Sequence, residues 1–481
     1  MRRAVFVIVV SASLAACTMG PDYVRPAVDA PARFRFEPSS TADSADTKWW
    51  TQYGDPVLDA LIAEALAHNR NVMIAAANVQ QAFALLEQAR AGAFPQIGYA
   101  TTAQRTKVPD VGLVAIIPRF PNPQTSYEAL LSASWELDLW GRVRRLSEAA
   151  RANALASEDA RRAVVLSLVA SVASDYIQLR GLDRQLAIAN QTLKAYGESV
   201  RLFELQFKYG RISRMNVAQA QSQYETAAAQ IPVIESQIAQ AEHALSILVG
   251  RDPGAIVRGK SIDDLAMPPV PSGVPSDLLS RRPDLMQSEE QLVAANAQIG
   301  AARALYFPTI SLTGAFGASS SDLSNLFTGP ARVWSYAGQV TGPIFTAGLI
   351  RGQVAQAEAA REAALLNYQQ AIHNAFGDVD NALVVKQKLS AQLAAQTELV
   401  AALKDYDHLA TLQYNGGYTS YSTVLQAEQA LFPAELTLAN IRASLLASSV
   451  NLYKAMGGGW VAIASDMTVS TGAPASEHRT E

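Results

Sequence analysis

Cysteine is almost absent from this chain of 481 residues, because Cys17 is its only one. No disulfide can therefore form within the chain, and its stability must come from packing and assembly. A strong charge of one sign is also lacking, since 39 basic and 43 acidic side chains leave a net charge of −4, which argues against a nucleic-acid partner. Beyond the N-terminus, no uninterrupted apolar run reaches the roughly 18 residues of a membrane helix. If the chain crosses a membrane, strands must do so.

Groupings of residues that carry out catalysis or hold a metal are missing as well. The five histidines are scattered and do not have the spacing of metal ligands. Asp378 and Asp380 lie two positions apart, so they would point to different faces of a helix. Neither a glycine-rich phosphate loop nor a nucleophile elbow is present. The sequence therefore predicts no enzyme activity, no catalytic residue, no cofactor and no metal site.

The N-terminus has the features of an export signal. Two arginines precede an apolar run about a dozen residues long, which ends in Leu14-Ala15-Ala16-Cys17. This ending resembles a lipobox, in which the cysteine is acylated and becomes the mature N-terminus. We therefore expect a signal peptide over residues 1–16 and lipidation, with palmitate, at Cys17. Because Thr18 rather than Asp follows, we expect the outer membrane. The alternative is an ordinary signal peptide with a chance cysteine.

The remainder of the chain contains an internal tandem repeat. Ala89–Pro95 returns 213 positions later as Ala302–Pro308, and farther along the offset is 207, where Gly210 matches Gly417 and Gly250 matches Gly457. Two tandem copies of one long unit therefore determine the architecture. The expected organisation is a lipidated extended tether at 17–55, a first repeat at 56–250, a Pro-rich linker at 251–275, a second repeat at 276–457 and a tail at 458–481.

Each repeat combines helices with a β-hairpin. Long stretches without proline, rich in Ala, Leu, Gln, Glu and Arg, predict helices, and a heptad seam that begins at Leu179 calls for partner helices. Alternation with a period of two, clearest over Ser126–Asp138, predicts strands long enough to cross a bilayer. We expect Pro232 and Pro433 to kink their helices. The elements expected are helices at 56–93, about 142–208, about 213–249, 276–306, about 349–414 and about 422–456, and hairpins at about 96–138 and about 308–346.

Four strands cannot close a barrel, because small barrels need about eight. An open edge in lipid would leave backbone groups unpaired, at several kcal/mol each. The strands would therefore be shared among subunits, and the strand count does not choose between a dimer and a trimer. The alternative is a pair of soluble hairpins that cap a helical bundle. Glu136 and Asp138 could line a barrel lumen or serve as polar residues at a strand end, and an interfacial belt would use some of the aromatics Trp135, Trp140, Trp334 and Tyr336.

Several motifs together resemble an outer membrane factor of the TolC/OprM type, in the lipoprotein branch that serves tripartite efflux systems. They are Cys17 with Gly20-Pro21-Asp22-Tyr23, the two Phe-Pro strand entries, the paired glycine turns, Arg281-Arg282-Pro283-Asp284-Leu285, and Asn451 to Trp460. The resemblance covers essentially the whole mature chain. It implies a trimer whose β-barrel lies in the outer membrane above a long α-helical barrel in the periplasm. It further implies docking to a periplasmic adaptor protein and to an inner-membrane pump of the resistance-nodulation-division (RND) class.

The function implied is transport rather than chemistry: a passive outer-membrane conduit through which small toxic solutes leave, driven by the partner pump. Control would lie at the periplasmic helix ends near Gly210 and Gly417. In relatives, ionisable residues just after the second glycine form the constriction, whereas this chain has neutral side chains there. We expect a latch of hydrogen bonds between Ser422, Thr423, Gln426 and Gln429 on one side and Arg211, Arg214 and Asn216 on the other. The alternative is that these residues are solvated groups at the helix ends.

Two other functions remain open from the sequence. One is a type I protein secretion channel of the same fold. The other is a periplasmic coiled-coil scaffold, anchored by lipid and without a pore. The cargo is also left open, because organic toxicants and metal ions both leave through this architecture.

Overall fold

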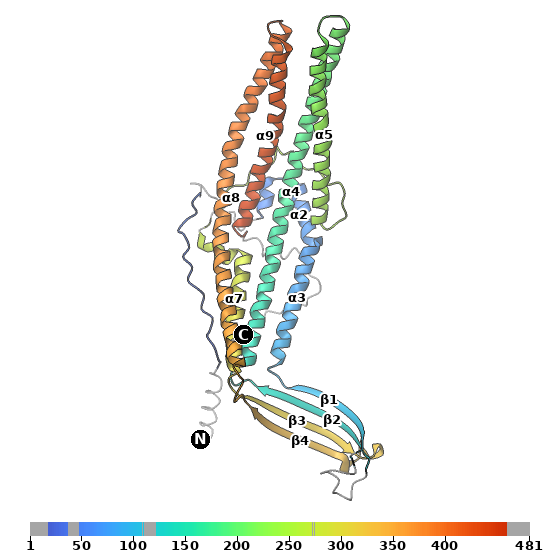
Figure 1. Ribbon diagram of the computed structural model, residues 1–481, viewed down its shortest axis with the longest axis vertical. Helices are drawn as coiled ribbons and strands as arrows, with labels where there is room; N and C mark the ends of the chain where they lie inside the picture. The colour runs from blue at the N-terminus through green and yellow to red at the C-terminus, as the bar shows by residue number, and fades with distance from the viewer. Residues whose placement is uncertain are drawn as a thin grey trace. The chain divides into compact units, whose positions relative to one another are not determined.

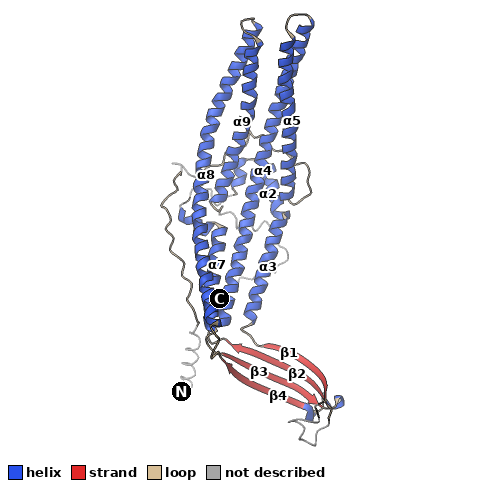
Figure 2. Ribbon diagram, in the orientation of Figure 1, coloured by secondary structure: helices blue, strands red, loops and turns tan. Residues whose placement is uncertain are grey.

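The computed structural model describes residues 18–36, 48–107, 109, 122–271, 273 and 275–458. The predicted signal peptide, the lipidation site Cys17 and the predicted tail from 459 onward lie outside these residues. Helices account for most of the described chain, and a single four-stranded sheet accompanies them (Figure 2). The predicted class, mainly α with a small β component, is therefore confirmed.

The elements follow one another in the same order in both repeats (Figure 1). The first repeat comprises α2 (Pro56–His68), α3 (Arg70–Ala91), β1 (Gln96–Thr106), β2 (Gln124–Leu137), α4 (Arg142–Lys208) and α5 (Arg214–Leu248). The second comprises α6 (Leu278–Arg281), α7 (Pro283–Ala304), β3 (Thr309–Ser320), β4 (Arg332–Thr341), α8 (Leu349–Asn415) and α9 (Tyr421–Ala455). Short 3₁₀ turns are η1 (Trp49–Tyr53), η2 (Pro275–Asp277), η3 (Leu323–Asn325) and η4 (Gly329–Ala331).

The chain divides into two compact units, and neither is a repeat. The first unit takes the segment up to Pro26 together with Gln80–Ala156 and Ser288–Tyr368, and the second takes the remaining residues. The two sequence repeats therefore do not coincide with the two compact units. The physical reason is that α3, α4, α7 and α8 each run through both units, so each repeat contributes helices to both.

In the first unit, the sheet has the order β1-β2-β3-β4 with every neighbouring pair antiparallel. An extended segment, residues 18–26, packs on the helical part of this unit. The Arg145 side chain, only 5% exposed, pairs with Asp22 at 2.7 Å and donates to the Met19 carbonyl. The Tyr23 hydroxyl donates to Glu289 of α7. The start of the predicted tether is thus held against α4 and α7 by specific contacts.

In the second unit, α4 and α5 form one long helical hairpin, and α8 and α9 form the other (Figure 1). The largest core lies where α2, α4, α5 and α9 meet, around Trp49, Tyr53, Tyr176 and Tyr453. Trp49 stacks on Tyr453 with ring centroids 5.3 Å apart, and the Tyr53 hydroxyl donates to the Leu446 carbonyl. The linker is part of this core as well, because Ile256, Ile262 and Leu265 are buried in it.

Three sequence expectations need correction. The helix predicted over 56–93 is broken at Asn69, and the one predicted over 276–306 is broken at Arg282 before Pro283, whose ring favours a helix start. The tether predicted to extend to residue 55 ends earlier, because Trp49, Trp50 and Tyr53 fill the core. Burying three large aromatic rings outweighs the loop-like composition around them.

The long helices run without interruption. α4 and α8 each have 67 residues, and α5 and α9 continue through Pro232 and Pro433. α4 contains a window of 18 residues with mean hydropathy 1.3, of which 56% is buried within the protein. Among the described helices it alone is long and apolar enough to pass that test, which a helix buried in a protein core passes equally well.

Candidate functional site

The first candidate feature is the apolar face of the sheet. The strand register places Tyr99, Leu131, Phe316 and Trp334 in one row across all four strands. Directly paired residues of an antiparallel sheet share a face, so these four side chains stand together. They are 83%, 56%, 55% and 68% exposed, respectively. Ile97 and Tyr336 occupy the neighbouring row of the same face. In the described chain these six side chains stay exposed, while Leu326 packs on the same face farther along, against Ala129 and Ala318.

The opposite face of the sheet consists mostly of small and polar residues, with Leu130 and Val333 as the large apolar side chains of one row. One row contains Gly98, Ser132, Ala315 and Ser335, and the row two positions along contains Gln96, Ser134, Thr313 and Ala337. The alternation seen in the sequence over Ser126–Asp138 is thus realised as two chemically different faces. An apolar face backed by a polar one is the pattern of strands that separate lipid from a water-filled lumen.

Both outer strands of the sheet have a free side. β1 pairs only with β2, and β4 only with β3, within the described chain. Every residue of these two strands is exposed. Rows of unpaired N–H and C=O groups on an apolar sheet are templates for pairing with another strand. The sheet therefore has the form of one sector of a larger sheet.

The predicted charged and aromatic residues at the strand ends have specific partners. Glu136 forms a bidentate pair with Arg142, with oxygen–nitrogen distances of 2.8 and 3.0 Å. Asp138 accepts from the backbone N–H groups of Val143 and Arg144 and so caps the start of α4. The structure thus assigns both carboxylates to the junction between β2 and α4, which was the second of the two roles expected.

Among the four aromatics considered for a belt, two are anchored and two are exposed. Trp140 stacks on Phe307 at 4.7 Å and donates to the Pro308 carbonyl at 2.7 Å, and Trp135 donates to the Ala93 carbonyl. Trp334 and Tyr336 stack on each other at 5.7 Å and stand on the apolar face.

The second candidate feature is the pair of hairpin tips. Gly210 and Gly417 have φ values of 71° and 77°, in the region that disfavours a side chain. Each ends its long helix in the same way, because the next residue donates back to the fifth residue before it, Arg211 to Gln206 and Tyr418 to Gln413. The two turns are therefore copies of one motif, as their equivalent positions in the sequence predict.

The predicted latch residues lie at these tips but do not bond across them within one chain. Arg211, Arg214, Ser422, Gln426 and Gln429 are exposed, and the described chain contains no side-chain hydrogen bond that joins the two groups. The bonds present are local: Asn216 accepts from Ser213, Thr423 pairs with Thr419, and Ser422 pairs with Ser420. The latch stays a prediction.

Just inside the tips lies an acidic cluster that the sequence analysis missed. Tyr421 donates to the Glu428 carboxylate at 3.3 Å, and the Tyr196 hydroxyl of α4 donates to the Glu428 carbonyl at 3.2 Å. Burial, with a further contribution from Asp407 of α8, raises the pKa of Glu428 to about 7. One Asp407 oxygen is buried without a hydrogen-bond partner, and burial raises the pKa of this group too. A comparison of the repeats could have found the cluster, since Val200 and Gln221 stand at the equivalent positions.

Comparisons with known proteins agree with this geometry. The family model for the outer membrane efflux protein matches residues 61–251 and 274–458. The chain is 36% identical to the cation efflux system protein CusC of Escherichia coli O6:H1, over 94% of this chain and 97% of that one. It is 37% identical to the solvent efflux pump outer membrane protein SrpC of Pseudomonas putida, over 93% and 96%. The open-state structure of the Neisseria gonorrhoeae MtrE outer membrane channel superposes with a TM-score of 0.83 at 32% identity, over 92% and 99%.

Proposed function

The chain belongs to the outer membrane efflux protein family, and from this membership and its two-faced sheet we propose that it is the outer-membrane channel of an efflux system. In this role it is a passive conduit through which small toxic solutes pass from the periplasm to the exterior. The channel itself carries out no chemistry on its cargo. Its free-energy source is a partner pump in the inner membrane.

The observation that carries this function is the row of Tyr99, Leu131, Phe316 and Trp334 on a sheet with two free edges. An exposed apolar sheet face of this kind is an aggregation hazard in water but is the favoured surface in lipid. The soluble-hairpin alternative gives no reason for the aromatic residues to stand on the exposed face.

The oligomer proposed is a homotrimer. Four strands per chain would give twelve in the assembly, enough to close a sheet around a lumen. Closure would pair every free edge of β1 with β4 of a neighbouring subunit, which removes the several kcal/mol that each unpaired backbone group costs in lipid. In that arrangement the polar face, including Ser132 and Thr313, would face the lumen.

The partners proposed are a periplasmic adaptor and an inner-membrane pump of the RND class. Support for this comes from the relatives, which are described as parts of a cation efflux system and of a solvent efflux pump. These two descriptions name cargoes of different chemistry, so we infer that the pump rather than the channel selects the cargo. An acylated Cys17 would add a lipid anchor, and loss of acyl labelling in Cys17→Ser would test it.

The test of channel function uses neighbouring residues on opposite faces of β2. Leu131→Arg places a charge on the proposed lipid face, where arginine costs about 2–4 kcal/mol near the bilayer midplane. Ser132→Arg places the same charge on the proposed lumen face. We expect purified wild-type protein to conduct ions in planar bilayers, Leu131→Arg to give little inserted channel, and Ser132→Arg to insert with altered conductance.

Equal insertion of the two variants would contradict the assignment of the faces. A lipid-anchored scaffold without a pore would conduct no ions even as wild type. A type I secretion channel would conduct in the bilayer, but its deletion would stop export of a protein rather than raise sensitivity to small toxicants.

The gate proposed is the latch at the hairpin tips, formed between neighbouring chains. Gln426→Ala combined with Gln429→Ala should raise the resting conductance and the sensitivity of cells to large antibiotics. Unchanged leak and unchanged sensitivity would rule out these two amides as part of the closure. Gln221→Ala, on the equivalent helix of the first repeat, is the matched control.

A further inference from the structure

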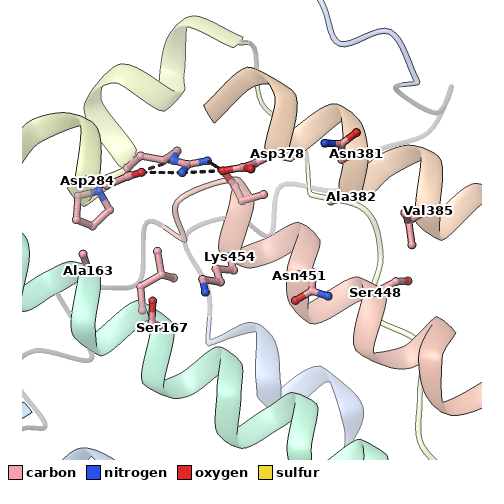
Figure 3. A pocket seen from close by; sticks show the side chains of 14 residues that line it. Ala163, Ser167, Asp284, Asp378, Asn381, Ala382, Val385, Ser448, Asn451 and Lys454 are labelled. Carbon is pink, nitrogen blue, oxygen red and sulfur yellow. Dashed lines mark hydrogen bonds and ion pairs between the residues drawn. The ribbon is translucent and has the colours of Figure 1, made fainter. Parts of the chain in front are cut away.

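A cavity of about 470 Å³ lies in the second unit where α7 and α9 meet end to end, between α4 and α8 (Figure 3). Its apolar wall is made by Leu166 and Ala163 of α4 and by Ala382 and Val385 of α8. Its size is within the range of pockets that hold small organic molecules. Four amide and hydroxyl side chains also line it: Asn381, Asn451, Ser167 and Ser448.

The one arginine in the cavity has no hydrogen-bond donor left for a ligand. Arg282 is 11% exposed and makes a bidentate pair with Asp284, at 3.0 and 2.7 Å. It also donates twice to Asp378, at 3.0 and 3.1 Å, and once to the Ala455 carbonyl. These bonds occupy the five N–H donors of a guanidinium group.

Lys454 differs from Arg282 in this respect. Its ammonium group makes no hydrogen bond or ion pair with any described residue, and the side chain lies among the lining residues drawn in Figure 3. Both carboxylates of the cavity are held by Arg282, so Lys454 is the cation there whose three N–H donors are available. A donor-rich rim above an apolar wall fits an anionic group attached to a hydrocarbon body.

The equivalent place in the first repeat shows that the fold does not require these charges. At offsets of 213 and 207, Arg282, Asp284, Asp378 and Lys454 correspond to Asn69, Asn71, Ser171 and Ile247. The Asn69 side chain donates to the Leu248 carbonyl at 2.8 Å, just as Arg282 donates to Ala455, the residue equivalent to Leu248. The same helix joint is thus built once with four neutral residues and once with four charged ones.

We propose that the cavity at the joint of α7 and α9 is a binding site for a small organic anion with an apolar body, such as an aromatic sulfonate or carboxylate. Lys454 pairs with the anionic group, Asn381 and Asn451 donate hydrogen bonds, and the wall of Leu166, Ala382 and Val385 contacts the hydrocarbon. The site is independent of pore formation, since binding is measured without any transport.

The test uses the full-length protein in lipid nanodiscs, with empty nanodiscs as the background. The anionic probe is 8-anilinonaphthalene-1-sulfonate, and the neutral probe of similar shape is N-phenyl-1-naphthylamine. We expect saturable binding of the anionic probe to wild type, and in Lys454→Gln an affinity about tenfold lower, the loss of one charge-assisted hydrogen bond. The neutral probe should change by less than about twofold.

Two further variants make the result specific. Lys388→Gln, an exposed lysine of α8 outside the cavity, should bind both probes as wild type does. Ala382→Trp, which fills the cavity, should abolish binding of both. If Lys454→Gln were to lose its helical circular dichroism, protection of Lys454 but not Lys388 from acetylation by the anionic probe in wild type would decide the question.

The proposal fails if wild type binds no more anionic probe than empty nanodiscs do, or if folded Lys454→Gln binds it as tightly as wild type does. It also fails if the probe leaves Lys454 as reactive as before, which would make Lys454 a distant counter-charge for Asp378. None of these results bears on conductance in planar bilayers, so failure here and failure of the channel function are distinguishable.

Discussion

In each repeat, two shorter helices meet end to end: α3 and α5 in the first repeat, α7 and α9 in the second. We call these two places the first and the second joint. They share one backbone arrangement but differ in the chemistry of their side chains. In the first repeat Asn69 follows the end of α2, and in the second Arg282 follows the end of α6; each residue directly precedes the next helix. Both have an extended backbone and donate their own N–H to the residue four positions earlier. Each side chain also donates to a carbonyl in the last turn of the last helix of its repeat, Leu248 of α5 or Ala455 of α9.

The comparison separates what the backbone requires from what the side chains add. Both joints are closed by a glycine with positive φ, Gly250 at 84° and Gly457 at 82°. A side chain at Gly250 would overlap the backbone carbonyl of His68, and one at Gly457 would lie 2.9 Å from the Arg281 carbonyl carbon. The glycines are thus determined by geometry, whereas the choice between amide and guanidinium determines the electrostatics of the cavity beside the joint.

The largest loss of folding stability is expected from adding a side chain at Gly250, in the first joint. Gly250→Ala adds a methyl group that meets rigid backbone, on top of about 1–2 kcal/mol of left-handed strain. We expect a loss of at least about 3 kcal/mol, with a somewhat smaller loss for Gly457→Ala, whose neighbours include the flexible Arg282 side chain. The thermal midpoint of the helical circular dichroism in nanodiscs measures both.

The hairpin-tip glycines provide the control for this experiment. Gly210 and Gly417 have φ values of 71° and 77°, but a methyl group there would meet no atom within 4 Å. Gly210→Ala and Gly417→Ala should therefore show the backbone strain alone. A midpoint for Gly250→Ala equal to that for Gly210→Ala would mean that the joint can open, and the equivalence of the two joints would lose its physical basis.

A smaller loss of stability is expected from removing the side chain of Asn69 in the first joint or of Arg282 in the second. These two losses should differ in their physical origin. Asn69→Ala loses the cap that Asn69 supplies to the N–H groups of Asn71 and Val72, and the bond to Leu248, at about 1–2 kcal/mol. Arg282→Met removes the ion pairs that Arg282 makes with Asp284 and Asp378. Both carboxylates are about half exposed, so water replaces the pair and the expected loss is again about 1–2 kcal/mol.

The dependence of stability on salt concentration distinguishes the deficit of Arg282→Met from that of Asn69→Ala. The stability deficit of Arg282→Met should shrink as ionic strength rises from about 0.05 M to about 1 M, because the Debye length falls to roughly 3 Å. The deficit of Asn69→Ala should stay constant, since it involves neutral groups. If both deficits respond to salt alike, the second joint is not held by charge and the contrast with the first is wrong.

Particular residues show how much of the structure could be predicted from the sequence. The long helices α4 and α8 follow from stretches free of proline, and the two faces of the sheet follow from alternation of residue types, because both are local patterns. The break at Asn69 has no strong local signal. The sequence around Trp49 and Trp50 predicts a tether, because the core partners of these residues lie far along the chain. The pair of Arg282 and Asp378 spans 96 positions, and neither residue alone indicates the other. The role proposed for Lys454 depends on the pairing of Arg282 with Asp284 and Asp378, which the sequence does not indicate.

The repeats also differ just inside the tips, and this difference gives a pH dependence. Asp407 and Glu428 face each other across α8 and α9, where the first repeat has Val200 and Gln221. The groups that face them are Tyr196 of α4, Tyr421 and Glu435 of α9, and Lys404 and His408 of α8, with Lys404 paired to Glu435 at 2.8 Å. The cluster is therefore acidic on balance, and burial disfavours its charged form.

The smallest predicted effect is the response of this cluster to pH. Folding raises the pKa of Glu428 from its ordinary value near 4.5 to about 7, so the folded protein binds more protons than the unfolded chain between these values. Its contribution to stability is therefore fully present below about pH 4.5 and is lost as pH rises through about 7. Because the carboxylate is partly exposed and coupled to Asp407, we expect a loss on the order of 1 kcal/mol, less than the full shift implies. Glu428→Gln should flatten the thermal midpoint between pH 5 and pH 8, while Glu225→Gln on the first repeat's exposed helix surface should keep the wild-type slope. A slope that survives in Glu428→Gln would place the titration elsewhere and make the tips of the two repeats electrostatically alike.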